Sequence, residues 1–144
     1  MSRAVVYDAI LADGQLGMDD ITFDAGNVKV NYDGDQRPND RMFIVLRWEA
    51  PDIDLRGDDS TIRKGGHHLS VWVHMYQEFS TDFTRIDKVI DALDKLLVDI
   101  IDRPGSDGRT LVMVEPEGHS RDLRDVTYET FCRSASYKVL SRAT

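Results

Sequence analysis

The sequence predicts an α+β fold, in which an N-terminal helix and one long amphipathic helix pack on a single twisted, mostly antiparallel β-sheet. The first observation is the stretch from His67 to Asp102, where a strand-like segment is followed, after a short turn, by a helical pattern. The second is a set of further strand-like segments before and after this stretch. With 144 residues, of which 41% are hydrophobic, we expect a single domain, 1–144, with one core.

The long helix is predicted from Asp82 to about Ile101, because apolar side chains recur there at steps of three and four residues. Thr81 or Asp82 offers an oxygen that can cap the first turn, and Arg103-Pro104-Gly105 follows as a stop signal. The apolar stripe consists of Phe83, Ile86, Ile90, Leu93, Leu97 and Ile100. A helix with such a stripe lies on a core.

The segment from His67 to Met75 alternates as a half-buried strand does. One face of this strand is apolar and can meet the helix stripe. It consists of Leu69, Val71, Val73 and Met75. Trp72 falls on the opposite face among polar residues, where a large aromatic residue often marks a contact surface. Two interpretations of Trp72 stay open, packing within the core and contact with another subunit.

Before this unit the sequence predicts a short helix and two strands. Ser2 can cap the helix, which ends near Gly14 or Gly17. Its apolar side consists of Val5, Val6, Ala9 and Ile10. Residues 28–32 alternate as a half-buried strand, whereas residues 42–46 are apolar on both faces. The second strand is therefore expected to be central, covered on both sides or, on one side, by a neighbouring subunit.

Two further strands and one long loop complete the prediction. Residues 110–115 predict a strand that Pro116-Glu117-Gly118 breaks, and Ser120 can cap a short helical turn over residues 121–125. Residues 127–140 alternate as a closing strand, which must bend to fit a small sheet. The polar stretch at about 50–66 predicts an exposed loop, either an arm that contacts a partner or a mobile excursion.

Charge and cysteine content limit the possible function classes. The chain has 26 acidic and 18 basic residues and a net charge of -8, which argues against wrapping nucleic acid or binding an anionic membrane. Cys132 is the only cysteine, so neither an intrachain disulfide nor a cysteine-rich zinc site can form. Asp8 interrupts any signal-peptide core, and no apolar run reaches the ~20 residues of a membrane helix. We therefore expect a cytosolic product without an anchor.

The residues predict no catalytic or cofactor-binding grouping. The histidines lack the spacing of metal ligands, and His68 and His74 would stand ~20 Å apart along their strand. No phosphate-binding glycine loop or nucleophile elbow is present, and Cys132 suits a core position better than a nucleophilic one. We therefore expect a protein that is not an enzyme and that uses no metal or cofactor. A small metal-dependent hydrolase using His68, His74 or His119 is the alternative from another class.

Three acids, Asp87, Asp91 and Asp94, follow one side of the predicted long helix. One interpretation is a solvent-exposed face on which Asp91 and Lys95 form a pair four residues apart. The other is that part of this acidic side faces a channel. Both interpretations stay open on the residues alone.

Five motifs follow one another in a defined order along the chain. They are RMFIVLRW at 41–48, LSVWVH at 69–74, FTRIDKVIDAL at 83–93, the acidic turn at 122–125 and Arg133 in the closing strand. This order resembles the tail terminator proteins of long-tailed (siphovirus-type) bacteriophages. In that family a "vwvh" strand precedes a helix of the "y..id.v...l" type, and a short acidic turn precedes a closing strand that contains an arginine.

The resemblance implies a small α/β subunit of the virion that assembles as a homohexameric ring at the head-proximal end of the tail tube. Such a ring stops polymerisation of the tube and provides the head–tail joining surface. The implied partners are further copies of the chain, the tail tube protein and a head–tail connector or stopper protein, with DNA passing through the lumen without specific binding. Assembly would take place in the host cytoplasm. A closed ring repeats one heterologous contact around its axis.

Candidate contact residues follow from this resemblance. Asp87, Asp91 and Asp94 are candidates for an acidic lumen, which would repel DNA phosphates. Candidates for the subunit or tube interface are Arg56, Arg63, Lys64 and Trp72. Deleting the 52–64 arm should abolish ring capping without unfolding the subunit. Another head–tail connector or tail-completion ring protein is the nearest alternative, since it shares size, acidity and ring assembly.

Overall fold

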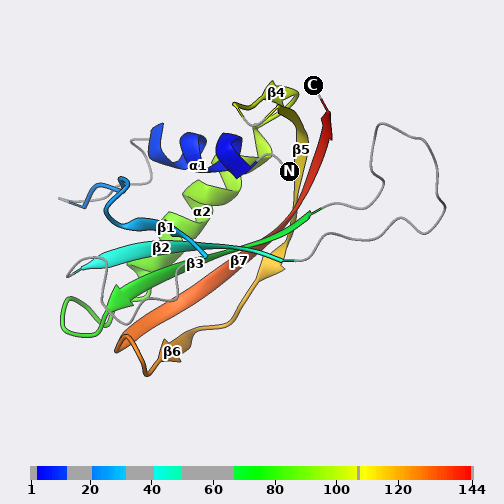
Figure 1. The fold of residues 1–144 in the computed structure, drawn as a ribbon. Coiled ribbons are helices and arrows are strands. Elements are labelled where there is room, and N and C mark those ends of the chain that lie inside the picture. Colours follow the sequence, from blue (N-terminus) through cyan, green and yellow to red (C-terminus); the bar gives the residue numbers. More distant parts are fainter. Residues whose placement is uncertain (1–2, 13–20, 32–40, 50–66, 107, 144) are drawn as a thin grey trace.

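The computed structural model describes residues 3–12, 21–31, 41–49, 67–106 and 108–143 (Figure 1). These ranges form two helices and one seven-stranded sheet. In chain order the elements are α1 (Arg3–Ala12), β1 (Val28–Val30), β2 (Met42–Trp48), β3 (His67–Tyr76), α2 (Thr84–Val98), β4 (Arg103–Pro104), β5 (Arg109–His119), β6 (Leu123–Asp125) and β7 (Thr130–Ala143). The fold is α+β with a curled, mostly antiparallel sheet, as the sequence predicts.

The strands of the sheet are ordered β1-β2-β3-β7-β5-β4, and β6 also pairs with β7. Strands β1 and β2 run parallel, whereas the other pairs of described strands are antiparallel. At the centre, β3 and β7 pair along the whole of β3, from His67 opposite Val139 to Tyr76 opposite Thr130. Strand β7 is long because β3 covers one of its edges while β5 and then β6 cover the other.

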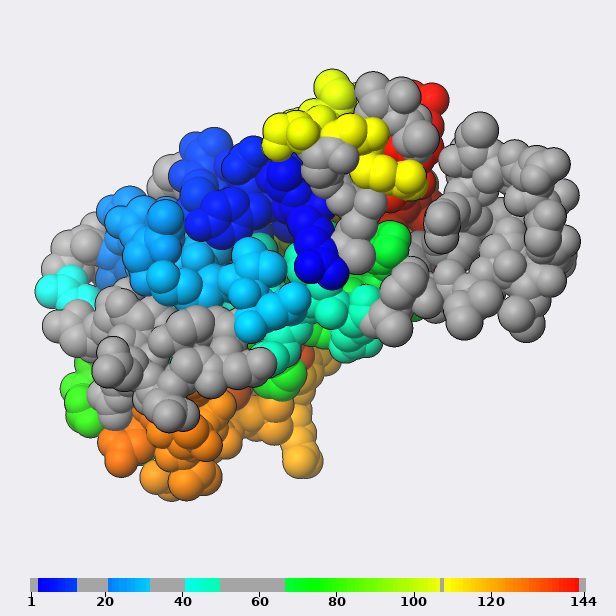
Figure 2. Space-filling view, in the orientation of Figure 1, coloured from blue at the N-terminus to red at the C-terminus, as the bar shows by residue number. Residues whose placement is uncertain are grey.

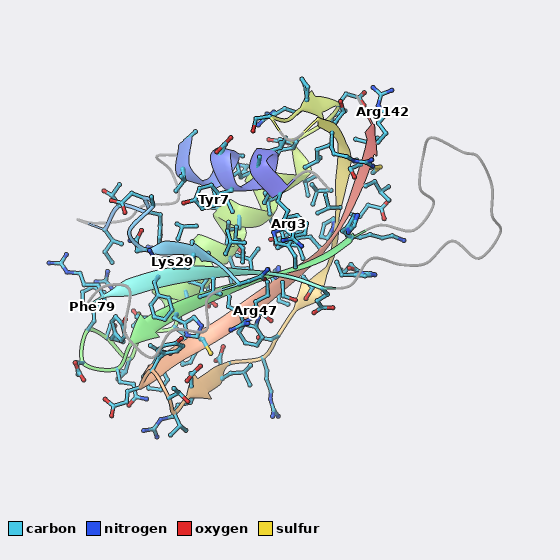
Figure 3. The ribbon with its side chains drawn as sticks, viewed as in Figure 1. Arg3, Tyr7, Lys29, Arg47, Phe79 and Arg142 are labelled. Carbon is cyan, nitrogen blue, oxygen red and sulfur yellow. The ribbon has the colours of Figure 1, made fainter. Side chains whose placement is uncertain are left out.

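The main core lies between the helices and one face of the sheet (Figure 1). From β3 it takes the predicted apolar face, Leu69, Val71, Val73 and Met75. From α2 it takes Ile86, Val89, Ile90, Leu93 and Leu97, and from α1 it takes Val5, Val6, Ala9 and Ile10. Arg3 of α1 lies over the ring of Trp48, 5.6 Å from its centroid (Figure 3). The predicted contact between the strand face and the helix stripe is confirmed.

Strand β2 is buried on both faces, as its apolar sequence predicts. Met42, Ile44 and Leu46 belong to the main core. Phe43 and Val45 point to the other face, where they join a second, smaller cluster. We call that other face the helix-free face. Strand β2 lies next to the β1 edge instead of at the centre of the sheet, so its burial comes from the residues of this chain on either side of it.

Helix α2 is shorter than predicted at both ends. It begins at Thr84, whose backbone N–H donates to Asp82 Oδ1 at 3.0 Å. It ends at Val98, because the next turn is tighter and the Ile100 N–H donates to the Leu97 carbonyl at 3.2 Å. The apolar stripe extends further than the helix because residues just outside its ends still pack on the core.

Two predictions for the segment after β4 are wrong. Strand β5 does not stop at Pro116, because a register shift between Pro116 and Gly118 lets pairing with β7 continue to His119. Proline is tolerated at such an irregularity in an outer strand, and Gly118 takes a φ of 130° that suits glycine. Residues 121–125 do not form a helical turn, since Leu123 opposite Cys132 begins a short strand pairing with β7.

Several boundaries also differ from the prediction. Strand β7 begins at Thr130, after a turn in which Asp125 Oδ1 accepts a hydrogen bond from the Tyr128 N–H at 3.0 Å. Strand β4, which pairs with β5, is too short to be seen in the alternation of the sequence. Strand β1 ends at Val30, because Asn31 takes a left-handed φ of 48°. The predicted loop at about 50–66 lies outside the described residues.

Candidate functional site

Helix α2 carries the three acids named as candidates for a lumen, and two of them are bonded to the sheet. Asp87 forms an ion pair with Arg133 of β7. Asp94 contacts both β5 and β7 through its two carboxylate oxygens. Asp91, in contrast, is exposed. The three acids therefore do not form one equivalent row, because two of them hold the helix against the sheet.

Arg133 lies where α2, β7 and the segment between β5 and β6 meet. Besides its ion pair with Asp87, its Nε donates to the Ser120 carbonyl at 3.2 Å. The same nitrogen lies 3.6 Å from Asp122 Oδ1. The guanidinium side chain is only 19% exposed, so it is held among these groups. The arginine and the acidic turn that the sequence singles out are therefore in contact.

A second polar group fixes the middle of α2. Tyr137 of β7 donates its hydroxyl to Asp94 Oδ1 at 2.5 Å, and His119 Nε2 lies 2.7 Å from Asp94 Oδ2. Burial, together with the hydrogen bond to Asp94, raises the pKa of Tyr137, which therefore remains a neutral donor. Both carboxylate oxygens of Asp94 are occupied, so this group stabilises the contact between the helix and the sheet.

The histidines considered as metal ligands have separate surroundings. His68 Nδ1 lies 2.7 Å from Glu117 Oε1, and His74 Nδ1 lies 2.8 Å from Thr130 Oγ1. His119 contacts Asp94 at a third place. Among the described residues, no group of three or more His, Cys, Asp or Glu side chains could hold a metal ion. The alternative of a metal-dependent hydrolase therefore gains no ligand set from this part of the chain.

The second cluster lies around His74 on the helix-free face. The His74 ring stacks on Phe43 with centroids 4.5 Å apart, and Tyr128 meets both rings edge-on. Burial lowers the pKa of His74 to about 4, so the ring is neutral at pH 7. Trp72 packs at the margin of this cluster, with its ring centroid 6.5 Å from that of His74, and remains partly exposed. Trp72 thus contributes to packing and also reaches the surface.

Of the remaining residues that the sequence singles out, the cysteine lies in the core and the three basic interface candidates lie outside the described ranges. Cys132 is buried, and burial raises the pKa of its thiol to about 11, as suits a core residue. Arg56, Arg63 and Lys64 lie outside the described residues. Arg47 of β2 and Arg142 near the end of β7 are further basic residues of the sheet (Figure 3).

Helix α2 also lines a surface hollow that the sequence does not reveal. This hollow has a volume of about 510 Å³. It is lined by Asp91, Asp94, Lys95, Val98 and Asp99. Val98 is 42% exposed, although it belongs to the same helix as the buried stripe. The helical periodicity places Val98 outside the apolar stripe. The sequence could therefore have predicted from this spacing that Val98 is an apolar residue at the surface.

A second exposed apolar residue, Val126, lies in the turn between β6 and β7. It is 80% exposed, the highest value among the large hydrophobic side chains of the described residues. The end of the sheet that contains this turn forms the lower end of the molecule in Figure 2. The sequence predicts a helical turn over residues 121–125, so the tip of a hairpin is not expected from the sequence alone.

No family model matches this chain, and no curated protein matches it. Within the described ranges, neither helix has the length and apolar character needed to cross a bilayer.

Proposed function

We propose that this chain is a structural protein of a bacteriophage virion, which forms a homohexameric ring at the head-proximal end of the tail tube. The ring stops polymerisation of the tube and provides the surface to which the head is joined. Its partners are further copies of the chain, the tail tube protein and a connector or stopper protein of the head. DNA passes through the ring without specific binding, which agrees with the net charge of -8.

The observation that carries this proposal is the contact of Arg133 with Asp122. The acidic turn and the arginine of the closing strand are the polar parts of the resemblance, whereas its other motifs are mainly apolar. The structure gives their joint presence a physical reason, since Arg133 Nε lies 3.6 Å from Asp122 Oδ1 and its Nη1 pairs with Asp87 of α2. These contacts join the turn, β7 and the helix that follows the "vwvh" strand.

The surface of the subunit also supports assembly into a ring. A closed ring needs two different surfaces on each subunit, because each contact is heterologous. The helix-free face presents the partly exposed Trp72, and exposed apolar side chains lie at several separate places, among them Ile101 and Val126. Of these residues, Trp72 carries the support, because tryptophan is enriched at protein interfaces.

The experiment that tests the proposal is electron microscopy of particles assembled without this protein, after deletion of its gene from the phage genome that encodes it. We expect tail tubes longer than those of the wild-type phage and without heads, because nothing would stop addition of tube subunits. Supplying the wild-type gene from a plasmid is the control, and it should restore tails of normal length with heads.

Tails of normal length beside unattached filled heads would contradict the terminator role. That result would place the protein on the head side of the joint, as a connector or tail-completion ring protein. Particles indistinguishable from the wild type would remove any role in the joint.

A further inference from the structure

The turn between β6 and β7 is closed over the helix-free face by an aromatic side chain. The Tyr128 ring packs edge-on against Phe43 and His74, with centroids 5.5 and 5.8 Å apart. The backbone of the turn is fixed as well, because the Tyr128 N–H donates to Asp125 Oδ1 at 3.0 Å. Tyr128 therefore joins the turn to the aromatic cluster around His74.

The segment that carries this turn has few buried contacts of its own. Strand β6 has three residues, and β7 is its partner among the described strands. None of the described residues 121–129 is fully buried. Arg124 Nη2 donates to Gln77 Oε1 at 3.3 Å, but this bond is exposed. Segments with few buried contacts open at a lower free-energy cost than the core does, so the turn can open while the main core stays folded.

His74 is the member of the cluster whose charge can change. Its side chain is 5% exposed, and its ring lies parallel to that of Phe43 with centroids 4.5 Å apart. Its Nδ1 lies 2.8 Å from Thr130 Oγ1, so its hydrogen-bond partner is a neutral hydroxyl. Aromatic stacking offsets only part of the cost of removing an imidazolium from water. The closed turn therefore favours the neutral ring.

The charged and titratable groups around His74 come from several elements. They are Arg47 of β2, Tyr76 of β3, Asp125 of β6, Tyr128 of the turn and Cys132 of β7. Asp125 favours protonation of the ring and Arg47 opposes it, whereas burial outweighs both. Cys132 is neutral, because burial raises the pKa of its thiol to about 11. The protonated ring therefore gains more from water than from its neighbours.

We propose that protonation of His74 releases the β6–β7 turn from the helix-free face while the main core stays folded, so that the turn is an acid-operated clasp. Tyr128 leaves the cluster, and water reaches the charged ring. The clasp works within one subunit and depends on no partner, so it goes beyond the proposed function.

The size of the effect follows from the affinity of the ring for its proton in the two states. The pKa of His74 is about 4 when the turn is closed, and an open turn returns the ring toward the ordinary value of 6.5. The ratio of open to closed protein should therefore rise about twentyfold between pH 7 and pH 5.

Cys132 can report this opening, because it is the only cysteine of the chain. Its side chain is 3% exposed, and it lies opposite His74 in the register of β3 and β7. Asp125 acts on the thiol as well as on the His74 ring, so the segment before the turn lies near both side chains. Release of the turn should therefore make the thiol accessible to a reagent.

The first test is the rate at which Cys132 of the purified full chain reacts with a dipyridyl disulfide, a reagent that also reacts with thiols in acid. Dividing this rate by that of N-acetylcysteine at the same pH removes the pH dependence of the reagent. At low reagent concentration the corrected rate follows the population of the open form. We expect it to rise about twentyfold between pH 7 and pH 5.

The variant His74→Gln should remove most of this rise, because it lacks the titrating ring. The matched control is His68→Gln, which makes the same substitution on the same strand at a side chain that is 29% exposed. It should keep the rise of the wild type.

The second test separates release of the turn from global unfolding. At pH 5, low concentrations of urea should change the corrected rate of the wild type only slightly, because an open turn exposes little surface. Global unfolding exposes the main core and therefore depends steeply on urea. Far-ultraviolet circular dichroism at pH 5 should match the spectrum at pH 7.

Three results would overturn the clasp: a corrected rate that is equal at pH 7 and pH 5, an undiminished rise in the His74→Gln variant, or a urea dependence as steep as that of global unfolding. The urea measurement uses the wild type alone, so it decides the question even when the variant fails to fold. Tail length in the gene-deletion experiment does not depend on the clasp, so the two proposals fail separately.

Discussion

His74 is a titratable residue placed where its charged form is unfavourable. Its side chain is stacked on Phe43, is within hydrogen-bond distance of Thr130 Oγ1 and is only 5% exposed. Burial lowers its pKa, an effect that Asp125 opposes and Arg47 reinforces. The desolvation of the ring is the largest of these influences, so the folded protein contains neutral imidazole at pH 7.

We predict that His74 makes the folded state less stable as the pH falls. The pKa of the ring is about 4 in the folded protein and 6.5 for an ordinary, solvated histidine such as that of the unfolded chain. Between these pH values the unfolded chain therefore binds the proton more readily than the folded protein does. The full free energy of unfolding is present above pH 6.5, and it falls as the pH is lowered toward 4. The part of this fall that is due to His74 is about 2 kcal/mol between pH 7 and pH 5. Urea unfolding of the wild type and of His74→Gln at both pH values measures this loss.

The His74→Gln variant should lose less stability on acidification than the wild type, by about that amount. Other ionisable groups titrate in both proteins and cancel in the comparison. If acidification costs the two proteins the same free energy, His74 is not the cause.

At the scale of the elements, α2 is held on the sheet by polar contacts as well as by its apolar stripe. Arg133 bonds to Asp87, which is in the first turn of the helix, and Tyr137 donates to Asp94 about two turns later. Both partners come from the same face of β7, since Arg133 and Tyr137 are separated by an even number of residues. The two contacts therefore set the position of α2 along β7.

Removal of the Tyr137 hydroxyl should weaken this attachment. We predict that Tyr137→Phe lowers the free energy of unfolding by about 1 kcal/mol, the typical net value of one hydrogen bond. The loss stays moderate because Asp94 keeps its contact with His119 and has access to solvent. Chemical denaturation of the two proteins at pH 7 measures the difference.

Tyr7→Phe is the matched control for this substitution. Tyr7 of α1 packs against the main core (Figure 3), and its hydroxyl makes no hydrogen bond to another described residue. Its substitution should change the free energy of unfolding by less than about 0.5 kcal/mol. Equal losses in the two variants would show that the Tyr137 hydroxyl has no special role.

At the scale of the whole molecule, stability comes mainly from the layer between the helices and the sheet. The main core contains residues of both helices and of β2, β3, β5 and β7, whereas the cluster on the helix-free face contains only a few residues around Phe43. Leu93 lies in the main core and is fully buried. Among the described residues, the larger apolar cluster therefore lies on the side of the sheet that carries the helices.

We predict that Leu93→Ala lowers the free energy of unfolding by about 2–5 kcal/mol, because it removes buried methyl groups and leaves a cavity between the two layers. Thermal and urea unfolding measure this loss. The control is Lys88→Ala on the exposed side of the same helix, which should change stability by less than about 0.5 kcal/mol. Similar effects of both substitutions would contradict the packing of α2 on the sheet.

Local sequence was sufficient for the parts of the fold whose side chains repeat regularly. The alternation from His67 to Met75 predicted β3 and its buried face, and the three-and-four spacing predicted the stripe of α2. The continuous apolar run of β2 predicted burial on both faces. In these segments each residue's environment depends on the periodicity of its own element, so the pattern can be seen in the chain.

Where local sequence signals predicted the wrong structure, pairing with β7 determined the conformation. Pro116 and Gly118 are breakers by local rules, yet β5 continues through them because β7 provides a partner along its whole length. For the same reason residues 121–125 contain a strand instead of a helical turn. Segments with weak or conflicting local preferences take the conformation that the neighbouring strand stabilises.

By itself the sequence determined the α+β class, the buried faces of its regular elements and the motifs behind the proposed tail role. Only the tertiary structure decided which acids of α2 are bonded to β5 and β7, and that Arg133 touches the acidic turn. These are relations between residues distant in the chain. Periodicity assigns a side chain to a face, but only the packed sheet determines which side chains meet across it.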